Sequence, residues 1–241
     1  MTLLNKYPVK YAFLEILLSY FIVTRISPFQ NVNVDLWNFN KNHYSYWLYS
    51  FFKILFIVHF ARLTSSYDFR EEFCIPKFKF VFVWQAFAIF VKLLVCIFFV
   101  LIILCLCFLF FTSESVIPWM EMGSSGFIWE IKSTQSLLLM VVTSLFTGGV
   151  EELFFRSFFI TKLKQMGISL FISSLISSVV FAYGHSYYGF VGFFMSLIFG
   201  IIFAGMYLRY KNVYYSIFVH SFYNVFVSFL LFLSNYSKEL L

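Results

Sequence analysis

The stretch FVFVWQAFAIFVKLLVCIFFVLIILCLCFLFF at residues 80–111 decides the fold class, because Lys92 is its only charged residue. As one α-helix it would be about 48 Å long. The hydrocarbon core of a bilayer is about 30 Å thick. The stretch therefore predicts a transmembrane helix that must tilt, kink or project from the membrane.

The composition of the whole chain agrees with this stretch. Of its 241 residues, 61% are hydrophobic and 12% are charged, whereas soluble domains are about 45–50% apolar and about 25% charged. Such a chain is too apolar for a soluble globule and for a disordered segment. Transmembrane β-strands alternate apolar and polar residues, but these segments are apolar on every face. We expect an all-α polytopic membrane protein.

Working outward from residues 80–111, about seven (six to eight) transmembrane helices are predicted in one bundle. The expected runs are Val9–Ile26, Tyr44–Phe60, Phe80–Phe111, Ser133–Lys164, Ile168–His185, Tyr187–Tyr210 and Val213–Ser234. The abundance of Phe, Ile, Lys, Asn and Tyr resembles the product of an AT-rich bacterial genome, which suggests a bacterial plasma membrane.

The net charge of +6 comes from Lys and Arg residues that lie mostly between the apolar runs. This distribution fits lipid headgroups and membrane topology, and it does not indicate a nucleic-acid partner. The basic loops Arg62–Lys79, Lys162–Lys164 and Arg209–Lys211 are expected on one side, and the acidic loop Thr112–Lys132 on the other. The positive-inside rule then predicts a cytoplasmic N-terminus.

Ionisable residues inside apolar segments are costly and are functional candidates by default. They concentrate near the C-terminal end, where Glu152 and Arg156 are spaced i, i+4 and can form an ion pair. Glu151 lies about 140° from Arg156 around the helix axis. The Glu152 carboxylate is thus neutralised by Arg156, and the Glu151 carboxylate is left for acid–base chemistry.

Two histidines and an asparagine complete this group. His185 ends one apolar run, and His220 and Asn224 share a face of the last one at i, i+4. Elsewhere only Glu15, Lys53, His59 and Lys92 compete as candidates.

Small residues predict how these helices pack. The pairs Ser173-Ser174 and Ser177-Ser178, with the glycines at 192, 200 and 205, are expected at close helix contacts. Gly148-Gly149 is the expected break in its helix.

Three motifs resemble those of one family, the CAAX protease and bacteriocin-processing (CPBP, or Abi) family. EELFFR at 151–156 is similar to its EExxxR motif, FAYGH at 181–185 to FxxxH, and HSFYN at 220–224 to HxxxN. Each motif alone is weak, but all three occur in order on separate apolar helices. The resemblance places the CPBP-type catalytic helices in residues 133–241, whereas residues 1–132 form transmembrane helices without recognised motifs.

The resemblance implies an intramembrane glutamic endopeptidase that acts without a metal. By it, Glu151 activates a water molecule that His185 also holds, while His220 and Asn224 stabilise the oxyanion. Glu152, Arg156 and Phe181 would support the site structurally. The implied substrate is a membrane-associated peptide or protein, in peptide-precursor processing or bacteriocin self-immunity. A raised carboxylate pKa in a buried site and preorganised hydrogen-bond donors would suit such chemistry.

Three alternatives stay open at this point. Glu151, His185 and His220 could bind zinc, although the HExxH spacing is absent. The chain could instead be a non-catalytic membrane scaffold or regulator that binds a sensor kinase or a transporter. A small transporter is less favoured, because no broken-helix pair recurs in two halves.

Overall fold

The computed structural model of the chain describes residues 9–24, 39–111 and 133–239, and every regular element within them is helical. The expected all-α class is confirmed. The elements in chain order are α1 (Val9–Thr24), α2 (Phe39–Leu63), α3 (Phe69–Glu72), α4 (Val81–Phe111), α6 (Thr134–Glu152), the π-helix η2 (Leu153–Phe159), α7 (Ile160–Gln165), α8 (Leu170–Gly184), the 3₁₀ helix η3 (Ser186–Tyr188), α9 (Gly189–Tyr210) and α10 (Val213–Glu239).

Five helical stretches in the described residues are long and apolar enough to cross a membrane. They are Tyr44–Leu63, Val81–Val100, Thr134–Gln165, Gly189–Tyr210 and Val213–Asn235. The two other expected spans form shorter helices, α1 with 16 residues and α8 with 15. The described part of α1 is about 24 Å long and α8 about 22 Å, less than a hydrocarbon core of about 30 Å. The chain is a polytopic membrane protein.

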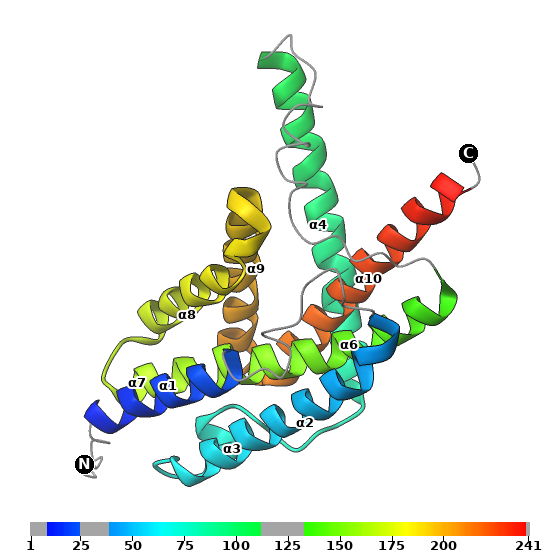
Figure 1. Ribbon diagram of the computed structural model, residues 1–241. Helices are drawn as coiled ribbons and strands as arrows, with labels where there is room; N and C mark the ends of the chain where they lie inside the picture. The colour runs from blue at the N-terminus through cyan, green and yellow to red at the C-terminus, as the bar shows by residue number, and fades with distance from the viewer. Residues whose placement is uncertain (1–8, 25–38, 112–132, 240–241) are drawn as a thin grey trace.

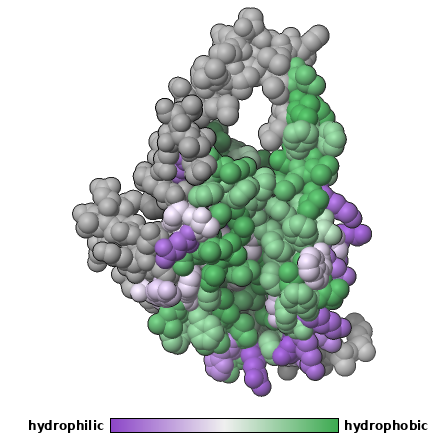
Figure 2. All heavy atoms as spheres, turned by 90° about the vertical axis from the view of Figure 1, so that its right-hand side faces the viewer, coloured by the Kyte–Doolittle hydropathy of each residue, from purple (hydrophilic) through white to green (hydrophobic). Residues whose placement is uncertain are grey.

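The outer surface suits a lipid environment. Exposed residues of α4 include Trp84, Phe98 and Leu106, and α4 extends beyond the other helices in Figure 1. The face drawn in Figure 2 is mainly hydrophobic, with hydrophilic residues at its lower end and a few at its two sides. Apolar side chains outside and polar ones at an end are what a bilayer requires.

The helix α6 is the centre of the packing, with α2 against one side and α10 against another (Figure 1). Gly148 and Gly149 make these approaches possible. A Cβ on Gly148 would lie 2.6 Å from Ser221 Oγ on α10, and one on Gly149 would lie 3.2 Å from Ile54 Cδ1 on α2. The predicted break at Gly148-Gly149 is therefore wrong: α6 continues through both glycines, which serve close packing.

The helices α8 and α9 make another close contact. A Cβ on Gly200 would lie 3.1 Å from Ser178 Cβ, while nothing lies within 4 Å of the corresponding position on Gly205. Ser177 is fully buried and donates a hydrogen bond to the Phe155 carbonyl oxygen at 2.6 Å. The expected packing role fits Gly200 and these serines but not Gly205.

The three basic segments meet at one end of the bundle. The Val213 amide, just after Arg209–Lys211, donates to the Cys74 carbonyl oxygen at 3.0 Å. Lys162 Nζ donates to the Thr64 carbonyl oxygen at 2.9 Å. Placing these segments on one side is consistent with the expected topology, while the cytoplasmic assignment of that side stays a prediction. The acidic segment Thr112–Lys132 lies outside the described residues.

Two sequence expectations about this end need correction. The segment Arg62–Lys79 is more than a charged loop, because it contains α3 and buries Phe73 completely. Lys162 is not a loop residue: it lies within α7, fully buried, 2.7 Å from Glu15 Oε2. Glu15 therefore pairs with Lys162.

Candidate active site

The two adjacent glutamates lie where the regular α-helix ends. Glu151 and Glu152 are the last residues of α6, and the next seven residues form the π-helix η2. Short π-helical segments inside α-helices are frequent at functional sites. The irregularity in this long helix thus follows the glutamates directly.

Glu152 and Arg156 form the expected i, i+4 ion pair. Arg156 Nε lies 3.2 Å from Glu152 Oε2, and neither side chain is exposed. The guanidinium Cζ also lies 4.5 Å from the centre of the Phe181 ring and 5.6 Å from that of Phe203. A buried carboxylate and these ring faces stabilise a cation that is held away from water.

His220 lies between the two glutamates. Its Nδ1 is 2.9 Å from Glu152 Oε1, and its Nε2 is 3.7 Å from Glu151 Oε2. Because a carboxylate only accepts hydrogen bonds, Nδ1 carries a hydrogen and donates it to Glu152. Glu152 therefore orients the imidazole so that Nε2 faces Glu151.

His185 is oriented by its own helix. Its Nδ1 lies 2.8 Å from the Phe181 carbonyl oxygen. A carbonyl oxygen only accepts, so Nδ1 is the donor, and in the neutral ring Nε2 is an acceptor. The Phe181 ring lies between the two histidines, with its centre 4.5 Å from that of His185 and 6.2 Å from that of His220.

Asn224 lies one turn after His220 on α10 and is half-buried. Within the described residues, its side-chain amide forms no hydrogen bond with another protein group; only its backbone carbonyl accepts one, from Ser228 Oγ at 2.8 Å. The amide is thus available as a donor toward a bound molecule.

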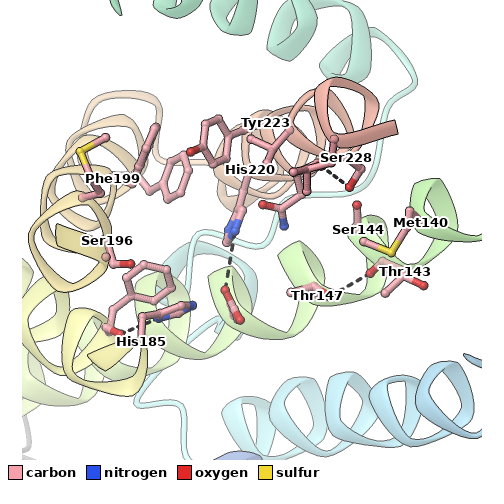
Figure 3. A pocket seen from close by; sticks show the side chains of 18 of the residues that line it. Met140, Thr143, Ser144, Thr147, His185, Ser196, Phe199, His220, Tyr223 and Ser228 are labelled. Carbon is pink, nitrogen blue, oxygen red and sulfur yellow. Dashed lines mark hydrogen bonds and ion pairs between the residues drawn. The ribbon is translucent and has the colours of Figure 1, made fainter. Parts of the chain in front are cut away.

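Glu151, His185, His220 and Asn224 line a single cavity of about 500 Å³. Figure 3 shows His185 and His220 pointing into it from two different helices. The Glu151 side chain keeps 23% of its surface exposed, whereas Glu152 has none. The structure thus separates a carboxylate that faces a cavity from one that is sealed in the protein, while the catalytic roles of the four residues stay predictions.

Several lining residues have no signal in the sequence. Phe203 on α9 stacks on His220 with ring centres 4.8 Å apart, but it is one of 38 phenylalanines. Tyr46 comes from α2, in the part of the chain without motifs, and its hydroxyl lies 2.7 Å from Thr147 Oγ1. Thr147 donates its own hydrogen to the Thr143 carbonyl oxygen, so Tyr46 donates to Thr147.

Metal ligation was the alternative use of the acidic and histidine side chains. Among the residues that the structure describes, no three His, Cys, Asp or Glu side chains gather closely enough to hold one metal ion. The alternative zinc set of Glu151, His185 and His220 is therefore not assembled as such a group.

Comparison with known proteins identifies the segment that carries this site. Residues 133–226 match the model of the family described as type II CAAX prenyl endopeptidase, Rce1-like. These helices are similar to those of the CAAX protease family. The resemblance inferred from the three motifs is confirmed, and all three lie within the matched residues. The chain is thus an integral membrane protein, and the segment that carries its cavity is similar to a family of proteases. Neither the curated proteins nor the solved structures gave a match.

Proposed function

We propose that the protein is an intramembrane endopeptidase in which Glu151 activates water to hydrolyse a peptide bond of a membrane-associated peptide. The observation that carries this proposal is the cavity: Glu151, His185, His220 and Asn224 reach it from three helices of the segment that matches the protease family.

The proposed reaction uses groups already aimed at the cavity. The Glu151 carboxylate takes a proton from a water molecule whose other hydrogen is accepted by His185 Nε2. The oxygen of that water attacks the peptide carbonyl carbon, and the carbonyl oxygen becomes an oxyanion. The Glu151 proton then passes to the leaving amine, which gives a carboxyl and an amino product.

The oxyanion needs hydrogen-bond donors in place before the reaction. The Asn224 amide supplies one. Donation from His220 Nε2 requires the imidazolium form, because Nδ1 already carries a hydrogen. The carboxylates of Glu151 and Glu152 flank that ring and balance its charge.

The substrate is proposed to be a membrane-associated peptide or protein, in peptide-precursor processing or bacteriocin self-immunity. Part of the cavity wall supports this choice, because Met140, Met195, Val227 and Leu231 line it together with the polar residues. Such a surface accepts an apolar segment that arrives from the bilayer.

Comparison of peptides from producing cells tests the proposal. Secreted and membrane-bound peptides would be compared between cells with the wild-type protein and cells with Glu151→Gln at the same amount of folded protein. We expect a new pair of fragments only with the wild type. If the peptide profiles are identical and the Glu151→Gln protein affects the cells in the same way as the wild type, the result would favour a non-catalytic scaffold that binds a sensor kinase or transporter.

A further inference from the structure

A second, smaller cavity adjoins the proposed active site. Its volume is about 190 Å³, and it shares six residues with the larger cavity, among them Glu151 and His185. At about 30 Å³ per water molecule, it has room for about six waters. Glu151 therefore lines both compartments, and a peptide held at Glu151 can extend into either of them.

The smaller cavity differs from the larger one by containing a cation. Lys53 of α2 lines it, together with Ser50 from the same helix. The Lys53 ammonium donates to the Val23 carbonyl oxygen at the end of α1 and lies 4.4 Å from the centre of the Tyr49 ring. Within the described part of the chain it forms no ion pair, although Glu151 lines the same cavity.

An ammonium group has three N–H donors, and the Val23 carbonyl oxygen uses one of them. Among the described residues, two donors and the positive charge are thus left for a molecule in the cavity. A carboxylate is the matching partner, since charge-assisted hydrogen bonds to carboxylates are short and strong. Without Lys53, the negative charge of Glu151 would repel a carboxylate from this compartment.

We propose that the smaller cavity is a subsite for a carboxylate of the substrate peptide, within a few residues of the bond that is cut, and that Lys53 determines this specificity. The carboxylate belongs either to the C-terminus of the peptide or to an Asp or Glu side chain. This inference depends on the proposed peptidase function for its meaning, but the binding itself can be measured without cleavage.

The test uses three synthetic peptides of Ala and Leu with an acetylated N-terminus. The first ends in a free carboxylate, the second in an amide, and the third in an amide with Glu as the preceding residue. The affinity of each peptide is measured for the full-length Glu151→Gln protein in lipid nanodiscs. The same measurement is made for three double variants, in which Glu151→Gln is combined with Lys53→Gln, Lys53→Arg or Lys92→Met. Lys53→Gln keeps a donor for Val23 without the charge, and Lys92 is an exposed lysine of α4 that lines neither cavity.

We expect at least one carboxylate peptide to bind about tenfold more tightly than the plain amide. Lys53→Gln should abolish that preference, whereas Lys53→Arg and Lys92→Met should retain it. The first and third peptides show whether the terminal or the side-chain carboxylate is recognised. Equal binding of all three peptides, or a preference that survives Lys53→Gln with an unchanged unfolding temperature, overturns the proposal. Absence of cleavage by the wild type would instead count against the peptidase function.

Discussion

Two clusters of charge lie on one continuous helical run, Thr134–Gln165, and they differ in what surrounds them. At the first, Glu151 faces two cavities and keeps part of its surface exposed. At the second, about three turns further on, the Lys162 side chain is fully buried and contacts Glu15 Oε2 at 2.7 Å and Gln165 Oε1 at 2.9 Å. A charge closed in by protein partners holds helices together, whereas a charge beside a cavity can act on a ligand.

The second cluster shows what a purely structural role looks like. Gln165 Nε2 donates to Glu72 Oε1 at 2.8 Å, and the other Glu72 oxygen accepts from the Ser66 amide at 2.6 Å. With Glu15 and Lys162, these residues connect α1, the segment after α2, α3 and α7. The first cluster combines both kinds of role, since Glu152 is sealed in and Glu151 is not.

The largest expected effect comes from breaking the sealed part of the first cluster. Glu152→Gln leaves the Arg156 cation without its carboxylate inside the membrane, and removing one partner of a buried pair costs about 3–5 kcal/mol. The substituted amide can still accept from His220 Nδ1, so the loss should fall chiefly on stability. Thermal unfolding in micelles measures it, with Glu151→Gln as the matched control.

Glu151→Gln should leave the unfolding temperature close to that of the wild type, because Glu151 faces the cavity and its contact with His220 is long, at 3.7 Å, so that a neutral amide of the same shape can take its place. An equal loss of folded protein in both glutamate variants would contradict the division of roles within the pair.

Breaking the second cluster is expected to lower the free energy of unfolding by a comparable amount, without lowering cleavage per folded molecule. Glu15→Gln removes the carboxylate that contacts the buried Lys162 ammonium, at a cost of up to about 3–5 kcal/mol. The double variant Glu15→Leu with Lys162→Met should cost less than either single change, because it removes both charges. Unfolding free energy and cleavage per folded molecule are both measured. A marked fall in cleavage per folded molecule would show that this cluster also serves the reaction.

A smaller effect is expected where α6 approaches its neighbours. Gly148→Ala places a methyl group 2.6 Å from Ser221 Oγ and 3.0 Å from the Ile217 carbonyl oxygen, which should push α10 and its His220 away. Overpacking of this kind costs about 1–3 kcal/mol, and we expect at least tenfold slower cleavage.

Gly149→Ala is the control for that change, since its methyl group would meet only the flexible end of Ile54. It should alter the unfolding free energy by less than about 1 kcal/mol and leave the cleavage rate almost unchanged. If both alanine variants behave alike, the close approach of α6 and α10 is not what positions His220.

The smallest effect is expected from chelators. In the proposed mechanism Glu151 activates water directly, so prolonged treatment with EDTA or 1,10-phenanthroline should leave the cleavage rate unchanged. A loss of activity that is restored by added zinc would favour the metal mechanism.

The sequence predicts those features that depend on spacing within one helix. The apolar runs indicate the helical membrane fold, and the i, i+4 spacing indicates the Glu152–Arg156 pair. The order of the three motifs indicates the family. These inferences hold because the helical period fixes which residues share a face.

Contacts between helices have no comparable signal in a single sequence. Nothing in the spacing shows that Glu152 also binds His220, that Lys162 turns inward to Glu15, or that Phe203 stacks on His220. The misjudged glycine pair has the same origin, because Gly148-Gly149 can mark either a break or a close contact, and only the position of α10 decides.

The most direct test of the central claim separates chemistry from binding at Glu151. Purified wild-type and Glu151→Gln proteins in nanodiscs would be compared for affinity toward the cleaved peptide and for single-turnover cleavage of it. Loss of the general base should slow cleavage by about 10²–10⁴-fold, with the peptide Kd within about twofold of the wild type. Cleavage at the wild-type rate by Glu151→Gln would contradict the assignment of Glu151 as the base.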